Sequence, residues 1–317
     1  MKNIIFTIFL EQEDFEHKKV NEFHENIEKY KDKLNNAREE YADYLNADYK
    51  IFNDKDWIKK FKDSLPINDY EAVNFYKHHV MRELANEYDN VCYMDFDCFP
   101  NLRNVMHNTN KNIFTLTDKF LCGKTPFSVI SLGSKFWKKW EDYEYMRENY
   151  GVTQDTPAIK YWNQRALYEM FDIGNSNDNP DFEVYNTGLM CATSKQIKKL
   201  DYFGNFDYWI DCFTEMRNNE FYPMRYYFGY NNECFFNLKI NLNKVPCHLE
   251  DGDWHSINFW EEQAFIYHEV GPTKIFDKYT CLGGAPYKYI NELTKEEDAY
   301  SFLKNEAIKL GDWNKLI

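Results

Sequence analysis

The chain has 317 residues and a formal net charge of −14, with 38 basic and 52 acidic side chains. Hydrophobic residues make up 44% of it and aromatic residues 19%, which is enough for a packed core and excludes a disordered chain. The acidic balance argues against a protein that coats nucleic acid or an anionic membrane over its whole surface, but it leaves room for a local basic groove.

Strand and helix signals alternate along the first third of the chain. Residues 3–10, 49–53 and 91–94 are apolar runs that predict strands. Between them, residues 13–45 and 71–88 carry apolar side chains every three or four positions, the spacing of an amphipathic helix. The order β-α-β-α-β predicts a parallel sheet with helices on its faces.

The rest of the chain has weaker signals. Further strands are predicted at residues 112–116, 127–132, 182–192, 241–246 and 265–268, and helices or turns at 134–148, 157–171 and 232–238. A capping box at Thr294 and Glu297 predicts a helix that runs to about Leu310. We therefore expect one globular unit with a helical tail.

Neither a membrane span nor a secretory signal is predicted, because no run of about 18 apolar residues occurs and residues 4–10 are too short and lack a cleavage site. The 8 cysteines show no CxxC pair and no disulfide-scaffold spacing, which favours a reducing cytoplasm. Residues with AT-rich codons abound, a bias typical of a phage, a virus or an AT-rich bacterium. For a phage protein the expected location is the host cytoplasm.

Two aspartates directly follow the third predicted strand. Asp95 and Asp97 are two residues apart, so on an extended chain they point to the same side. In open α/β sheets, ligands bind at the carboxyl ends of strands. Paired carboxylates there repel each other unless a cation joins them, and hard cations such as Mg²⁺ or Mn²⁺ take oxygen ligands. The spacing thus predicts a divalent metal site, the alternative being two acidic loop residues.

Residues 76–97 resemble the nucleotide-sugar half of GT-A-fold glycosyltransferases. They are most similar to the retaining family that includes glycogenin, galactinol synthase and bacterial lipopolysaccharide galactosyltransferases. That family has an aromatic-rich helix with a basic residue, followed by a strand that ends in a DxD motif. Lys77 falls near the position of the family's arginine, and Asp95 and Asp97 match its DxD.

Three later segments resemble the family's motifs in the family's order. Residues 185–190, Tyr-Asn-Thr-Gly-Leu-Met, resemble its N-[ST]-G-hydrophobic motif. Residues 232–237, Asn-Glu-Cys-Phe-Phe-Asn, resemble its DQDxLN motif with departures. Residues 268–274 resemble its HxxGxxKPW motif without the final Pro-Trp.

The resemblance implies an α/β, Rossmann-like nucleotide-sugar-binding fold of the GT-A type, with a mixed central sheet and a helical C-terminal tail. The glycosyltransferase domain would span residues 1–280, and a helical extension would span 281–317. The distance between DxD and the next motif exceeds the family's usual one, which implies an insertion or acceptor region within residues 101–180.

The resemblance also implies a metal and a donor site. Asp95, Asp97 and His268 would hold the cation that binds the donor diphosphate, and one imidazole among carboxylates favours Mn²⁺ over Mg²⁺. Lys77 and Lys274 are expected to stabilise negative charge on the leaving diphosphate. Gly271 is expected to let the backbone approach a phosphate closely.

The resemblance also implies that residues of two of these motifs lie near the reacting sugar. Asn186, Thr187 and Gly188 are expected near the donor sugar and the acceptor, although Asn-Thr-Gly is also common in turns. Glu233 and Asn232 replace the family's Gln and Asp. A carboxylate at position 233 could stabilise an oxocarbenium-like transition state, act as a nucleophile, or act as a general base, the last implying inversion.

The nucleotide base is expected over the first strand, near Thr7 and Phe9. The sequence as a whole predicts a metal-dependent glycosyltransferase with a nucleotide-diphosphate sugar donor, UDP-linked by preference, and retention of configuration. The acceptor is open among a glycan, a protein and DNA with modified bases, the last as a phage-encoded enzyme. The alternative from another class is a non-catalytic module that binds a nucleotide sugar or glycan.

Overall fold

The computed structural model describes residues 1–10, 31–65, 67, 69–124, 185–211, 232–250, 254, 256–257 and 264–268. The expected strand at 127–132, the helices at 134–148 and 157–171, most of the region 101–180 and the extension 281–317 lie outside these residues. The expected division into a domain and an extension therefore stays a prediction.

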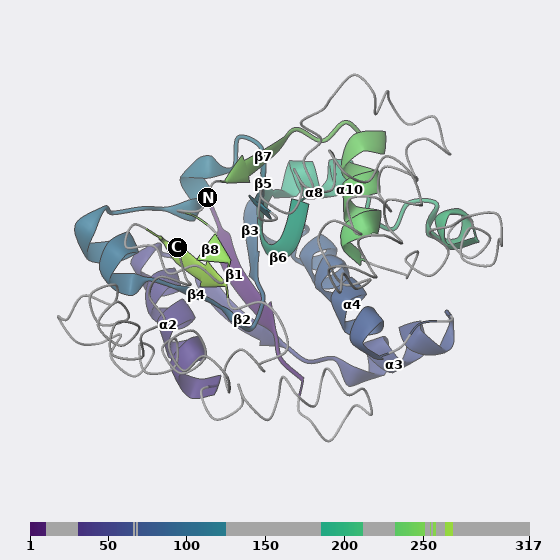
Figure 1. The fold of residues 1–317 in the computed structure, drawn as a ribbon, viewed down its shortest axis with the longest axis horizontal. Helices are drawn as coiled ribbons and strands as arrows, with labels where there is room; N and C mark the ends of the chain where they lie inside the picture. The colour runs from purple at the N-terminus through teal and green to yellow at the C-terminus, as the bar shows by residue number, and fades with distance from the viewer. Residues whose placement is uncertain are drawn as a thin grey trace, which may run out of the picture.

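A six-stranded sheet forms the centre of the molecule, in the order β2-β1-β3-β6-β5-β7 (Figure 1). β1 is parallel to both β2 and β3, β6 is antiparallel to β3 and β5, and β5 is parallel to β7. The α/β fold that the element order predicts is confirmed, and the sheet is mixed, as the resemblance implies, and not all parallel. The strands are β1 (Asn3–Ile8), β2 (Asp48–Phe52), β3 (Asn90–Met94), β5 (Phe120–Lys124), β6 (Tyr185–Thr193) and β7 (Cys247–Glu250).

Helices cover both faces of this sheet. Figure 1 shows α2 on one side and α4, α8 and α10 on the other. The described helices are α2 (Lys31–Tyr44), α3 (Lys55–Asp63), α4 (Asp69–Leu84), α8 (Ser194–Leu200) and α10 (Asn232–Leu242). None of the described helices is long and apolar enough to cross a membrane.

The two faces of the sheet belong to two separate apolar clusters. Along β3, Val91 and Tyr93 pack with the α4 side, whereas Cys92 and Met94 pack with the α2 side. This alternation follows from the period of two along a strand. Because both faces are covered, β3 reads as a continuous apolar run in the sequence, and this made the strand predictable.

A small second sheet lies beside the first and has the order β4-β9-β8. Its strands are β4 (Cys98–Pro100), β8 (Ser256–Ile257) and β9 (Ile266–His268). β4 and β9 are antiparallel, and Cys98 lies opposite His268. This pairing places the late histidine next to the end of β3, although about 170 residues separate the two partners.

Two predicted strands are wrong. Residues 112–116 contain a 3₁₀ helix (η4, Ile113–Leu116), because the Asn112 side chain accepts the Phe114 N–H and the Thr115 hydroxyl bonds back to the Asn112 carbonyl. Residues 241–246 begin as the end of α10, and the strand starts only at Cys247.

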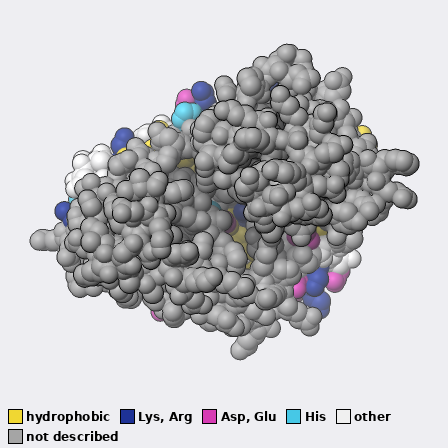
Figure 2. Space-filling model, in the orientation of Figure 1, with side chains coloured by type: hydrophobic (Ala, Val, Ile, Leu, Met, Phe, Trp, Pro, Cys, Tyr) yellow, Lys and Arg dark blue, Asp and Glu magenta, His cyan; other side chains and the backbone are white. Residues whose placement is uncertain are grey.

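The helix α3 and the strand β5 were not predicted. α3 is short and rich in charge, and its fold depends on packing Trp57 against Phe61 and Tyr76. Figure 2 shows basic and acidic side chains next to each other at the lower right, where α3 lies. Such mixed charge is typical of a solvated helix face.

Candidate metal and donor site

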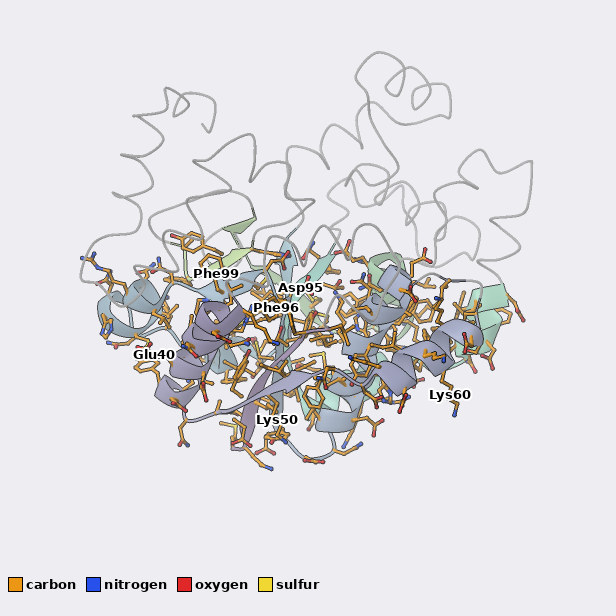
Figure 3. The ribbon with its side chains drawn as sticks, turned by 90° about the horizontal axis from the view of Figure 1, so that it is seen from below. Glu40, Lys50, Lys60, Asp95, Phe96 and Phe99 are labelled. Atoms are coloured by element: carbon orange, nitrogen blue, oxygen red, sulfur yellow. The ribbon has the colours of Figure 1, made fainter. Side chains whose placement is uncertain are left out.

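The backbone after β3 turns so that both aspartates leave the sheet at its carboxyl edge. The Asp95 N–H donates to the Gly188 carbonyl at 2.7 Å, and the Cys98 N–H donates to the Asp95 carbonyl at 2.8 Å. The first bond ties the turn to β6, and the second closes it. Figure 3 shows Asp95 and Phe96 near the centre of the described structure, with Glu40 and Lys60 at its sides.

Two carboxylates and one imidazole meet at this turn. His268 Nε2 lies 3.3 Å from Asp97 Oδ1 and 3.7 Å from Asp95 Oδ2. Burial lowers the pKa of the His268 imidazole, but the carboxylates of Asp97 and Asp95 outweigh burial, so its pKa is raised. The structure thus brings together all three side chains that the sequence predicts as metal ligands.

The second oxygen of Asp95 has other partners. Lys77 Nζ lies 3.6 Å from Asp95 Oδ1, and the Tyr93 hydroxyl donates to the same oxygen. Lys77 is buried and also lies over the Tyr93 ring, 5.2 Å from its centroid. Burial, together with the nearby Asp95, raises the pKa of the Tyr93 phenol well above its usual value, so it remains a hydrogen-bond donor. Asp95 is therefore oriented before any ligand binds.

The donor atoms at this turn fit a hard divalent cation. Asp97, Cys98 and His268 each offer a ligand atom, and these atoms lie within 4.8 Å of one another. Cys98 is the least suited, because burial raises the pKa of its thiol well above the usual value and its Sγ lies 3.3 Å from the Gly188 carbonyl as a donor. Carboxylate and imidazole groups from Asp95, Asp97 and His268 form the better set for Mn²⁺ or Mg²⁺.

Gly188 makes room for the imidazole. A β-carbon on Gly188 would lie 2.1 Å from His268 Cε1 and 2.7 Å from His268 Nδ1, far closer than atoms can approach. The Gly188 N–H donates to the Asn186 side chain at 2.8 Å. Packing against His268 is a function of Gly188 that the sequence did not indicate, beside its predicted place at the donor.

The motifs at residues 185–188 and 232–237 contact each other directly. Glu233 Oε1 accepts the Thr187 N–H at 3.2 Å, and the Asn232 side chain donates to Thr187 Oγ1 at 2.9 Å. Asn237 binds both backbone groups of Tyr185, at 2.9 and 3.0 Å. The first turn of α10 is thus fixed against the start of β6, with Glu233 and Asn232 buried.

The two residues expected near the nucleotide base lie at the end of β1. Thr7 is fully buried, and its hydroxyl has no hydrogen-bond partner in the described part of the chain. The Phe9 ring lies 4.3 Å from the Phe96 ring, which stands between the two aspartates in the sequence. Gly271 and Lys274 lie outside the described residues, so their expected roles remain predictions.

Arg38 is a site residue that sequence analysis missed. It is fully buried on α2, and its guanidinium contacts the backbone carbonyls of the turn that carries the aspartates. A signal was present, because Arg38 follows Leu34 by four positions and precedes Tyr41 by three, on the stripe of the helix that faces the core.

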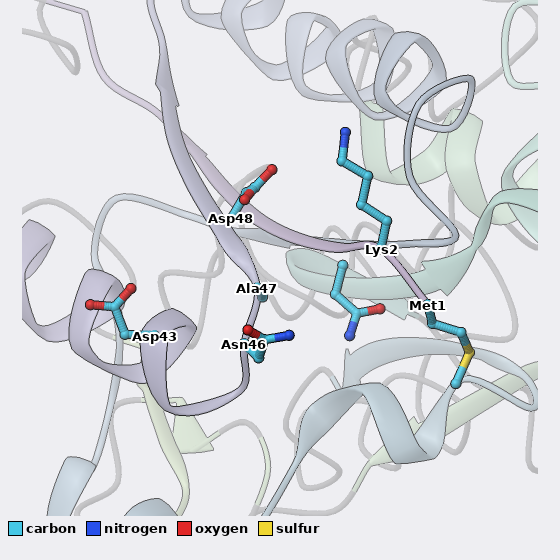
Figure 4. A pocket seen from close by; sticks show the side chains of 7 residues that line it. Met1, Lys2, Asp43, Asn46, Ala47 and Asp48 are labelled. Carbon is cyan, nitrogen blue, oxygen red and sulfur yellow. The ribbon is translucent and has the colours of Figure 1, made fainter.

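A polar cavity of about 610 Å³ lies at the opposite edge of the sheet (Figure 4). It is lined at the start of β1 and β2 by residues that include Lys2, Asp43 and Asp48. Since β1 and β3 are parallel, their amino ends lie away from Asp95. The cavity is therefore separate from the three predicted metal ligands.

Structural comparison finds glycosyltransferases among the solved structures that are similar to this chain. One is a glycosyltransferase involved in the glycosylation of the major capsid of PBCV-1, which aligns over 86% of this chain and 94% of its own, with 12% identity and a TM-score of 0.41. A second is mouse xyloside xylosyltransferase 1, which aligns over 85% of this chain and 98% of its own, with 10% identity and a TM-score of 0.44. A third is the galactosyltransferase LgtC in complex with donor and acceptor sugar analogues, which aligns over 92% of this chain and 94% of its own, with 11% identity and a TM-score of 0.47.

No protein-family model matches the sequence, and no curated protein matches it. At identities of 10 to 12% and TM-scores of 0.41 to 0.47, these likenesses carry no argument about the activity of this chain. The function must therefore be inferred from the residues of the site.

Proposed function

We propose that this protein is a metal-dependent glycosyltransferase that uses a nucleoside-diphosphate sugar, with UDP-sugars as the first candidates. One observation carries the proposal: Asp95, Asp97 and His268, from segments far apart in the sequence, meet at the carboxyl end of β3. The motif at residues 185–188 is bonded to Asp95 through the Gly188 carbonyl, and the motif at residues 232–237 is bonded in turn to Thr187. This edge of an open α/β sheet is where such folds bind nucleotides.

Asp95, Asp97 and His268 would hold Mn²⁺, or Mg²⁺ as the second choice. The bound cation would neutralise negative charge on the donor diphosphate as the sugar leaves. Lys77 would add a positive charge beside Asp95, since its Nζ already lies 3.6 Å from that carboxylate. Gly271 and Lys274 are proposed to contact the diphosphate from the segment after His268.

The donor would lie along the carboxyl ends of β1, β3 and the start of β6. The buried Thr7 hydroxyl, which has no hydrogen-bond partner among the described residues, and the Phe9 ring support a place for the nucleotide at the end of β1. Asn186, Thr187 and Gly188 are proposed to contact the sugar, because the Gly188 carbonyl is bonded directly to the Asp95 N–H. An amide can bind sugar hydroxyls as both donor and acceptor.

Glu233 is the proposed catalytic carboxylate, supported by Asn232. Its Oε1 is oriented by the Thr187 N–H, which fixes the carboxylate next to the proposed sugar site. A buried carboxylate at this place would stabilise positive charge that develops at the anomeric carbon, or attack that carbon. Either role favours retention of configuration over inversion.

The test is donor hydrolysis without acceptor. The protein is incubated with Mn²⁺ and a panel of UDP-, GDP-, ADP- and CMP-linked sugars, and the released nucleotide is measured. We expect slow release from at least one nucleoside-diphosphate sugar, loss of release after EDTA, and recovery on adding Mn²⁺. The same donor should raise the melting temperature only when Mn²⁺ is present.

Each result separates the candidate functions. A donor that stabilises the protein with Mn²⁺ but is never hydrolysed or transferred would favour a non-catalytic binding module. No hydrolysis and no Mn²⁺-dependent stabilisation with any donor would reject the proposed function. CMP-sugars serve as a negative control, because they lack the diphosphate that the metal would bind.

A further inference from the structure

Arg38 is the most deeply buried charged side chain near the proposed metal site. Its exposed fraction is 0%, and it lies on α2, on the side of the sheet away from α4. Its Nε donates to the Cys98 carbonyl at 2.9 Å, and its Nη2 donates to the carbonyls of Asp95, at 3.3 Å, and of Phe96. Three of the four carbonyls between residues 95 and 98 thus converge on one guanidinium.

The remaining contacts of Arg38 are also uncharged. Its Nη1 donates to the Asn35 side chain at 3.2 Å, and its guanidinium lies over the Phe96 ring, 4.9 Å from the centroid. No carboxylate in the described part of the chain forms an ion pair with it. A buried charge is costly without compensation, and here backbone dipoles provide the compensation.

The contacts of Arg38 fix the orientation of the peptide groups between the two aspartates. The Asp95 carbonyl receives both Arg38 and the Cys98 N–H, which closes the turn. The Phe96 ring contacts both the Arg38 guanidinium and the Phe9 ring. With these carbonyls directed at α2, the side chains of Asp95 and Asp97 are left to face His268.

We propose that Arg38 is a positioning residue that sets the geometry of the 95–98 turn and thereby the affinity of the site for a divalent cation. The inference rests on the proposed function for the identity of the metal site. Arg38 is not one of the proposed metal or donor ligands, and its contacts go to the backbone of the turn. A planar guanidinium with five donors can bind several carbonyls at fixed angles, whereas a lysine ammonium acts as a compact point charge.

The experiment measures Mn²⁺ binding to the donor-free protein by titration calorimetry, for the wild type, Arg38→Lys and Arg38→Met. Outer-shell partners of metal ligands usually contribute roughly 10–100-fold to affinity, and we expect a loss of that size for Arg38→Met. Arg38→Lys should regain part of the loss, because it keeps the charge but cannot reproduce the planar contacts. The half-saturating Mn²⁺ concentration for donor hydrolysis should rise in the same order.

Two controls separate positioning from general stability. Tyr41→Phe removes a buried hydroxyl from the same helix, which donates to the Lys111 carbonyl at 3.2 Å, accepts the Ile113 N–H at 3.3 Å and makes no hydrogen bond to the 95–98 turn among the described residues. It should lower the melting temperature while leaving Mn²⁺ affinity unchanged. Arg82→Met removes an exposed arginine that pairs with Glu83 and should change neither quantity.

Unchanged Mn²⁺ affinity in folded Arg38→Met, or an equal loss in Tyr41→Phe, would overturn the inference. If Arg38→Met does not fold, Arg38→Lys decides, and wild-type affinity in that variant overturns the inference. A wild-type protein that binds Mn²⁺ but turns over no donor rejects the proposed transferase while the Arg38 comparison still holds. A wild-type protein that binds no divalent cation rejects both.

Discussion

The two sides of the candidate site are built in different ways. On the α10 side, Glu233 and Asn232 make hydrogen bonds of 3.2 and 2.9 Å to Thr187, within the range of ordinary hydrogen bonds. On the metal side, His268 Nε2 stands 3.3 and 3.7 Å from the two aspartates, longer than a typical hydrogen bond of about 2.7–3.2 Å. On the α10 side, the polar groups of Glu233 and Asn232 are hydrogen-bonded to Thr187. On the metal side, the distances between His268 and the two aspartates suit ligands that share a cation.

If the protein is the proposed transferase, donor binding and chemistry should depend on separable groups. Removing a metal ligand should abolish donor binding and turnover together, because the diphosphate loses its anchor. Changing the carboxylate on α10 should leave metal binding intact and reduce only turnover.

Asp97→Ala should have the largest effect. It removes the carboxylate nearest to His268, so Mn²⁺ affinity should fall by more than the roughly 10–100-fold that an outer-shell change costs, and donor hydrolysis should drop to background. Calorimetry and nucleotide release measure the two effects. Asp43→Ala, at the cavity on the opposite edge of the sheet, is the matched control and should behave as the wild type. Wild-type Mn²⁺ affinity in Asp97→Ala would remove Asp97 from the metal site.

Glu233→Gln tests the other side. The amide oxygen can still accept the Thr187 N–H, so the fold and the Mn²⁺ affinity should be unchanged. The charge is lost, and turnover should fall about 100-fold or more, the size of effect known for acid, base and nucleophile residues. Nucleotide release at saturating Mn²⁺ and donor measures it. Full activity in this variant would show that the site needs only the hydrogen bond and not the carboxylate.

Gly188→Ala should have an intermediate effect at the junction of the two sides. The added β-carbon would collide with His268 Cε1 at 2.1 Å and displace the imidazole, so we expect a roughly 10–100-fold loss of Mn²⁺ affinity and a stability cost of about 1–3 kcal/mol. Gly204→Ala is the matched control, since its β-carbon would meet Asp201 instead. If both variants lose Mn²⁺ affinity equally, the packing of His268 on Gly188 is not the cause.

The smallest predicted effect concerns the pH dependence of stability. Burial, with a smaller effect from Lys77, lowers the pKa of His78 well below 6.5, and both its ring nitrogens lack hydrogen-bond partners among the described residues. Below pH 6.5 the unfolded chain therefore binds a proton at His78 that the folded protein does not bind. The free energy of unfolding should decrease as the pH falls below 6.5, by at most about 1.4 kcal/mol per pH unit.

His78→Phe isolates this contribution. The ring would keep the stack on Tyr202, at 3.9 Å, and remove the titrating group. Urea unfolding at pH 8 and pH 5.5 should show a smaller loss in the variant than in the wild type. In the metal-free protein His268 acts with the opposite sign, because its raised pKa adds stability that is lost as the pH rises, so only the difference between the two proteins is informative. Equal losses would contradict the prediction.

The part of the fold near Asp95 could be predicted from the sequence because each of its signals is local. β1 and β3 are covered on both faces and read as apolar runs, and the spacing of Asp95 and Asp97 follows from strand geometry. β5 gave no such signal, since its sequence, Phe-Leu-Cys-Gly-Lys, is short and its pairing shifts register at Gly123. Its place is decided by β6 and β7, which come from distant parts of the chain.

The candidate site shows the same limit. The proximity of His268 to the aspartates was expected only from a resemblance to known motifs, because nothing in the local sequence links it with Cys98. The hydrogen bonds of Arg38 to the carbonyls of the 95–98 turn were not predicted. A single arginine within a helical stripe does not reveal which carbonyl groups it will contact. The resemblance to known motifs placed both Glu233 and Thr187 near the donor sugar. The hydrogen bonds of the Asn237 side chain to the backbone of Tyr185 became visible only in the structure.

The pairing of Cys98 with His268 has a consequence for how the protein assembles. Joining segments about 170 residues apart raises the contact order, and the entropy of closing such a loop must be overcome before the pairing yields any stability. During synthesis, the six-stranded sheet can be completed once β7 has formed, while the nascent chain still lacks His268, the last of the three candidate metal ligands. Cation binding by all three side chains would then become available only after β9 docks on β4, so it would report that this pairing has formed.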